Sequence, residues 1–148
     1  MRFVTPFVLA AASAVACGGG ASPSQVNVLQ VAGQYQITQQ GIETSCGDGG
    51  ATIPSVTATV TQTAGASPFS LRDTGGTTFN GTVQSNGDFT ATAVFGPDGT
   101  GNTFTQRLEG RFTTSGFTGR LSVDVQPRNC AFTRNWTATK QGSPNVIP

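Results

Sequence analysis

The chain has no histidine and a single lysine, Lys140, among its 148 residues. Without histidine it cannot form a Ser-His-Asp triad, a Cys-His dyad or a histidine-ligated zinc site. One lysine leaves one candidate for Schiff-base chemistry. The only two glutamates, Glu43 and Glu109, fall on different predicted elements, so no carboxylate pair for glycoside cleavage is visible. These absences predict that the protein is not an enzyme and uses no cofactor and no metal ion.

Charged residues are also scarce, at 10% of the chain. Eight basic and seven acidic residues are present, and loss of Arg2 with an N-terminal leader would leave seven of each. No basic stripe is available to attract nucleic acid, so we expect no nucleic-acid partner. The solvent-facing positions are instead expected to hold Thr, Gly, Ser and Gln, and this composition is typical of exported β-proteins.

The N-terminus predicts export. An apolar stretch covers residues 3–16 and is interrupted only by Thr5, Pro6 and Ser13. It is shorter than the roughly 20 apolar residues that a membrane-spanning helix needs. A basic start, an apolar middle and small residues at the end are the features of a secretory signal peptide. We therefore predict a signal peptide over residues 1–16.

Two cleavage patterns overlap at Ala14-Val15-Ala16-Cys17. The A-x-A pattern suits ordinary signal peptidase and would leave Cys17 as a free thiol. The same residues resemble the bacterial lipobox, although Ala14 stands where that family usually has Leu. Cysteine parity favours the lipobox, because a lone thiol beside a disulfide pair invites wrong pairing. The resemblance implies acylation of Cys17, and several acyl chains at about 0.8 kcal/mol per CH₂ would hold the protein on a membrane.

The rest of the chain divides into three parts. Residues 17–25 comprise the lipidated cysteine and a Gly/Ser-rich tether, residues 26–140 form the folded domain, and residues 141–148 form a C-terminal tail. The lipoprotein resemblance implies a bacterial cell envelope location. Because Gly18 rather than Asp follows the cysteine, it further implies the outer membrane.

Apolar and polar residues alternate with period two through the folded domain, which is the pattern of half-buried β-strands. Eight segments carry it, at residues 31–37, 56–61, 69–72, 79–84, 89–95, 104–112, 117–125 and 130–138. Short turns and the lack of crossover helices favour an antiparallel meander. Closure of the meander would bury its single apolar face and remove both edges. The predicted fold class is therefore all-β, an eight-stranded antiparallel up-and-down β-barrel.

The sequence predicts the backbone conformation of two turns. Asn86-Gly87 between two alternating runs is the strongest hairpin signal, and we expect a two-residue turn with positive φ at both positions. In the later turn at residues 113–116, Gly116 is expected to supply the positive φ.

The remaining cysteines support the closure of the barrel. Cys46 follows the first predicted strand and Cys130 begins the last. In an eight-stranded up-and-down barrel these strands are antiparallel neighbours, so both cysteines would lie at the same rim. An even pair in an exported protein favours a disulfide. Such a bridge closes a loop of roughly 84 residues and contributes about 4 kcal/mol in the chain-entropy model.

A few residues resemble those of the lipocalin and avidin group of small calyx-shaped barrels. Gly33-Gln34-Tyr35 is similar to that group's Gly-x-Trp, with Tyr for Trp. Arg134 and Trp136 in the last strand resemble the late region whose Arg packs across the first-strand aromatic. The resemblance implies the barrel fold and transfers no ligand.

Arg134 is the most informative charged residue of the domain. The alternation places it on the inward face between Phe132 and Trp136, where a charge must be paired or hydrogen-bonded. It would serve either as an anchor for an acidic head group or as a structural clamp stacked on Tyr35. A bulge near Asn129 would turn it outward instead.

A ligand pocket is one reading of the interior. Its candidate residues are Tyr35, Gln62, Gln106, Arg134 and Trp136, and the alternative is that they pack in the core and rim. Phe beside Gly in the interior fits either a cavity or a tight fill. We expect a membrane-anchored, non-catalytic lipoprotein that binds a small apolar or amphipathic ligand, in a pocket of about 300 Å³ or more. The alternative is an envelope module with a filled core that acts through its surface.

Overall fold

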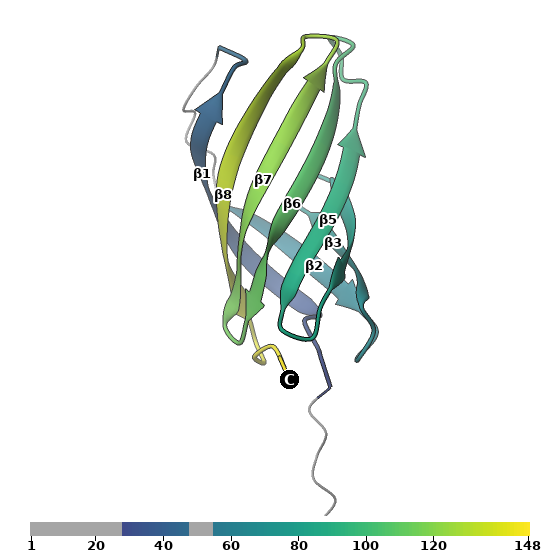
Figure 1. Cartoon of the computed structure of the whole chain (residues 1–148), viewed down its shortest axis with the longest axis vertical. Coiled ribbons are helices and arrows are strands. Elements are labelled where there is room, and N and C mark those ends of the chain that lie inside the picture. The colour runs from purple at the N-terminus through teal and green to yellow at the C-terminus, as the bar shows by residue number, and fades with distance from the viewer. Residues whose placement is uncertain (1–27, 48–54) are drawn as a thin grey trace, which may run out of the picture.

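The computed structural model describes residues 28–47 and 55–148. They form a closed barrel in which each strand pairs antiparallel with its neighbour in the chain and β1 pairs with β8 (Figure 1). This confirms the predicted fold class. The predicted signal peptide, Cys17 and nearly all of the tether lie outside the described residues. The strands are β1 (Gly33–Thr44), β2 (Val56–Gln62), β3 (Pro68–Asp73), β4 (Thr78–Val83), β5 (Asp88–Phe95), β6 (Thr103–Thr113), β7 (Gly116–Gln126) and β8 (Cys130–Gln141).

Alternation along each strand decides which side chains enter the barrel. In β2, Ala58 and Val60 are buried while Thr59 and Thr61 face solvent. Ten large side chains lie in the interior with almost no exposure, namely Val31 just before β1 and nine strand residues: Tyr35, Ile37, Val60, Leu71, Phe79, Val83, Leu108, Phe112 and Phe117. No helix in the described part of the chain is long and apolar enough to cross a membrane.

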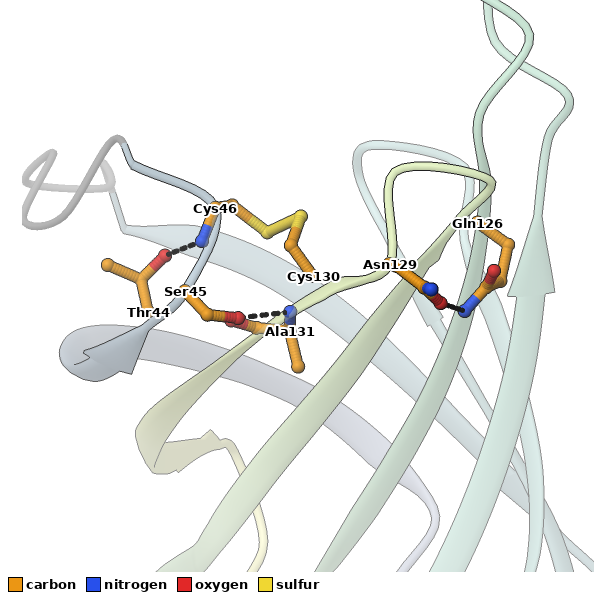
Figure 2. The surroundings of a disulfide bond; sticks show 7 residues. All are labelled: Thr44, Ser45, Cys46, Gln126, Asn129, Cys130 and Ala131. Carbon is orange, nitrogen blue, oxygen red and sulfur yellow. Dashed lines mark hydrogen bonds between the residues drawn. A yellow bond between two sulfur atoms is a disulfide. The ribbon is translucent and has the colours of Figure 1, made fainter.

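The seam between β1 and β8 carries the Cys46–Cys130 disulfide, which confirms the predicted bridge. The two Cα atoms are 5.0 Å apart. Beside the bridge, the Ser45 N–H donates to the Ala131 carbonyl at 2.8 Å, and the Ala131 N–H donates to Ser45 Oγ at 2.8 Å (Figure 2). The end of the barrel with this bridge is called the upper end below, and the opposite end is called the lower end.

Unequal strand lengths make the two ends different. β2, β3 and β4 have six or seven residues, whereas β6, β7 and β8 have eleven or twelve. β1 pairs with β2 only from Gly33 to Ile37, but with β8 as far as Thr44. The long strands therefore extend past the short ones and form the wall of the upper end (Figure 1).

Both turn expectations are wrong in detail. Gly87 has a φ of 89°, but Asn86 does not have positive φ. Gln84 accepts from the Gly87 N–H and donates to the Asp88 carbonyl, which is the pattern of a three-residue loop with a glycine bulge. Gly116 also lacks positive φ, and a Cβ there would collide with the Ala138 carbonyl. Gly116 is needed for the close approach of β7 and β8.

Candidate functional site

The lower half of the barrel is solid. Phe112 lies at its centre, with ring centroids 4.7 Å from Phe89, 5.4 Å from Phe117 and 5.6 Å from Phe69. Tyr35 joins the cluster at 6.0 Å from Phe112. Most of these contacts are edge-to-face or tilted, the arrangement that aromatic rings prefer. In this half of the barrel, the small glycines beside large phenylalanines therefore indicate a tightly packed interior rather than a cavity.

The segments that flank β1 and β8, around Gln30 and Asn145, close the lower end beneath this cluster. The backbone of Gln30 exchanges two hydrogen bonds of 2.9 Å with Val146. Next to it, Asn145 is only 3% exposed. Its Nδ2 donates to the carbonyls of Thr113 at 2.7 Å and Gly116 at 3.2 Å. The burial of Asn145 was not predicted, because one Asn in a Gly/Ser/Pro-containing tail has no local pattern that marks it as buried.

Tyr35 and Gln62, two of the predicted pocket residues, belong to this lower closure. The Tyr35 hydroxyl lies 2.6 Å from the Val31 carbonyl oxygen and 2.7 Å from Asn145 Oδ1, and it can donate its one proton to either acceptor. Burial raises the pKa of Tyr35 well above its ordinary value of about 10. Gln62 Oε1 accepts from the Val31 N–H at 2.8 Å, and its Nε2 donates to the Ala66 carbonyl. Through these hydrogen bonds both side chains help to hold the lower closure together.

The cation beside Tyr35 is Lys140, and the alternative that Arg134 stacks on Tyr35 is wrong. Tyr35 and Lys140 are register partners on β1 and β8, whereas Arg134 is opposite Gly41, near the upper end. Lys140 Nζ is 5.9 Å from the Tyr35 ring centroid and donates to Asn145 Oδ1 at 2.7 Å. Burial lowers the pKa of Lys140.

The upper half contains a cavity of about 240 Å³. Three of the five predicted pocket residues line it, namely Gln106, Arg134 and Trp136. Its full lining is Gln39, Asp73, Thr77, Phe95, Phe104, Gln106, Leu121, Val123, Phe132, Arg134 and Trp136. The volume is below the roughly 300 Å³ expected of a pocket for a drug-sized ligand. The barrel is thus filled below and hollow above.

Arg134 faces the interior, as the alternation predicted. The strand begins at Cys130 without a slip near Asn129, and the register shift lies in β1 between Gly41 and Glu43 instead. The Arg134 guanidinium carbon is 4.5 Å from the Phe132 ring centroid. Burial lowers the pKa of Arg134. Among the described residues no carboxylate forms an ion pair with it; those that pair are Glu109, Asp88 and Glu43, with other arginines.

Two polar atoms of the cavity lining are buried without a hydrogen-bond partner in the described part of the chain, Trp136 Nε1 and Gln39 Oε1. Trp136 is 3% exposed, and its ring packs edge-to-face on Phe79. Gln39 and Trp136 are register partners across β1 and β8. Extending the alternation of Tyr35 and Ile37 by one step would have placed Gln39 inside.

Phe95 and Phe104 form the aromatic rim of the cavity. They are register partners on β5 and β6, and their ring centroids are 5.9 Å apart. Phe95 is 48% exposed, unusual for an inward-facing phenylalanine. The alternation that turns Phe95 and Phe104 inward was visible in the sequence. Their position at the opening of the cavity was not, because it depends on where the shorter strands end.

Within residues 28–47 and 55–148, no group of three or more His, Cys, Asp or Glu could hold a metal ion. Comparison with protein-family models, curated proteins and solved structures finds no match to this chain. The site must therefore be interpreted from its own chemistry.

Proposed function

We propose that this protein is a membrane-tethered, non-catalytic binding protein that holds a small amphipathic ligand in the upper half of its barrel. The observation that carries the proposal is the unpartnered Nε1–H of Trp136 in a cavity lined by aromatic, aliphatic and polar side chains. A buried donor without a partner costs about 1–3 kcal/mol. A ligand that accepts this hydrogen bond and fills the cavity would remove that cost.

The cavity supports a ligand of limited size. Its volume of about 240 Å³ is too small for a drug-sized or long-chain lipid ligand. Leu121 and Val123 form apolar wall, and Arg134, Gln106 and Gln39 supply polar groups. A compact molecule with one apolar part and one polar part fits this lining best.

The binding proposal is tested by NMR on the indole N–H of Trp136, the only tryptophan. We expect a saturable shift of this signal on titration with p-cresol, a small amphipathic probe. Val123→Phe should abolish the shift, because Val123 is 2% exposed and lines the cavity, so a larger ring fills it. Val94→Phe is the matched control, since Val94 is 70% exposed.

Overpacking by Val123→Phe can cost about 1–3 kcal/mol, so Leu121→Phe serves as a second blocking variant and the spectrum of each variant shows whether it is folded. No saturable shift in the wild-type protein, or an undiminished shift in folded Val123→Phe and Leu121→Phe, would contradict a binding cavity.

The tether is proposed from the sequence alone. Cys17 is the proposed acylation site and the link to the bacterial envelope, with the outer membrane as the proposed location. Cys17→Ser is expected to abolish acylation and move the protein from the membrane to the soluble fraction, measured by fractionation and intact mass. Ser24→Ala, also in the tether, should stay in the membrane fraction. A Cys17→Ser protein that remains membrane-bound would remove this part of the proposal.

A second candidate function is interaction through the outer surface, as an envelope module. The observation that favours it is an open groove on β2, β3 and β4 with mostly hydroxyl and amide side chains. Its lining residues are Thr61, Gln62, Thr63, Pro68, Phe69, Ser70, Asn80 and Gly81. The groove has no unpartnered buried polar atom among the described residues, so we rank it below the cavity.

A further inference from the structure

The two unpartnered polar atoms of the cavity specify one chemical group. Trp136 Nε1 can only donate and Gln39 Oε1 can only accept. The two residues are opposite each other on β1 and β8, so their Cβ atoms lie about 5 Å apart. A hydroxyl both donates and accepts, and a single hydroxyl between the two side chains can satisfy both.

The guanidinium of Arg134 specifies a second group. Arg134 lies two residues from Trp136 on β8, about 6.6 Å along the strand, and both line the cavity. The one acid in the lining is Asp73, whose Oδ1 accepts the Thr77 N–H at 2.9 Å. No ion pair joins Asp73 to Arg134. The guanidinium is therefore available to a carboxylate, its best-matched hydrogen-bond acceptor.

The body of the ligand has to fit between these two groups. The cavity presents the rings of Phe95, Phe104, Phe132 and Trp136. Aromatic walls favour a flat aromatic ligand through offset and edge-to-face contacts. A benzene ring with para substituents spans a distance comparable to the separation of Trp136 and Arg134.

We infer that the cavity binds a small aromatic hydroxy acid, with its hydroxyl between Trp136 and Gln39 and its carboxylate on Arg134. This inference rests on the proposed binding function and adds the ligand's chemical class. The hydroxyl provides the missing partners of two buried atoms, and the carboxylate neutralises a half-buried charge.

The test uses 4-hydroxybenzoate, with benzoate and 4-hydroxybenzamide as matched probes that lack the hydroxyl and the charge. Affinities come from calorimetry, and the indole N–H signal of Trp136 reports the hydrogen bond. We expect 4-hydroxybenzoate to bind with a Kd of about 1 mM or tighter, and both other probes to bind about tenfold or more weakly. The Trp136 signal should move downfield with 4-hydroxybenzoate and much less with benzoate.

Two variants separate the contributions of the groups. Arg134→Gln should weaken 4-hydroxybenzoate about tenfold or more and leave 4-hydroxybenzamide nearly unchanged. Trp136→Phe should remove the advantage of 4-hydroxybenzoate over benzoate. Arg120→Gln is the control, because Arg120 is on the neighbouring strand β7 with an exposed side chain whose partner is Glu43. It should bind all three probes like the wild-type protein.

The failures are distinguishable. If p-cresol and 4-hydroxybenzamide bind as tightly as 4-hydroxybenzoate, the binding function stands and the hydroxy-acid inference is overturned. If benzoate binds as tightly as 4-hydroxybenzoate, the placement of the hydroxyl between Trp136 and Gln39 is overturned, while the binding function stands. A water molecule that bridges Trp136 and Gln39 would produce this result. If none of the four probes binds to the folded protein, both proposals fail.

Discussion

Replacement of Cys46 and Cys130 together by alanine is expected to lower the free energy of unfolding by about 4 kcal/mol. The bridge spans a sequence separation of 84, so it constrains most of the described chain in the unfolded state. It also holds the upper part of β1, which pairs with β8 but not with β2 beyond Ile37. For a domain of this size the loss corresponds to a melting temperature roughly 10–20 °C lower.

Urea unfolding of the oxidised wild-type protein and of the double variant measures this difference. The wild-type protein kept in a reducing agent is the control and should unfold like the double variant, because neither protein has the covalent link. A difference below about 1 kcal/mol would contradict the prediction. It would mean that the hydrogen bonds of Ser45 and Ala131 suffice to hold the seam.

The barrel was predictable from the sequence because its determinants are local. Period-two alternation gives each strand one buried face, and turn residues separate the strands. Closure followed from the need to bury the apolar face and to remove both sheet edges. The cysteines supported it, since a meeting of the first and last strands brings Cys46 to Cys130. The inward direction of Arg134 followed from the same alternation. These inferences needed no knowledge of how far each strand extends.

The division of the interior into a solid and a hollow half was not predictable in this way. It depends on strand length and register, which set where β2, β3 and β4 end. One error was avoidable. Counting back from the disulfide along two antiparallel strands places Tyr35 opposite the end of β8, next to Lys140, and well away from Arg134. The resemblance to a Gly-x-Trp barrel led to the wrong cation because this count was not made.

The burial of Asn145 is a second feature that could not be predicted from the sequence. Asn145 lies in the segment predicted as a tail, yet it is only 3% exposed, within the range of the core residues. Its amide connects three parts of the chain: the hydroxyl of Tyr35, the ammonium of Lys140 and the carbonyl of Thr113. A polar residue with this many partners is recognised only from tertiary structure, because it has no periodic apolar neighbours.

Asn145→Ala is expected to lower the free energy of unfolding by about 3 kcal/mol. The change removes one of the two acceptors of the Tyr35 hydroxyl, the acceptor of Lys140, and the donor to the Thr113 and Gly116 carbonyls. Each buried group left without a partner costs about 1–3 kcal/mol, and relaxation and water entry recover part of the sum. Asn135→Ala is the matched control, because Asn135 is exposed on β8, and it should change stability by less than about 0.5 kcal/mol.

Alkaline unfolding gives a second measure of the same variant. Because burial raises the pKa of Tyr35, the unfolded phenol loses its proton above about pH 10 while the folded one keeps it. This contribution to stability is therefore present below pH 10 and is lost as the pH rises. Lys140 has the opposite effect on stability. Because its pKa is lowered in the folded protein, the unfolded state binds the proton more tightly, and stability rises with pH up to the ordinary pKa of lysine, about 10.4.

The phenolate absorbance of the single tyrosine follows this transition directly. In the wild-type protein it should appear only with unfolding, above the ordinary pKa of a phenol. Asn145→Ala starts with less stability, so its transition should occur at a lower pH than that of the wild-type protein or Asn135→Ala. A coincident transition in all three proteins would show that the buried amide does not hold the lower end of the barrel closed.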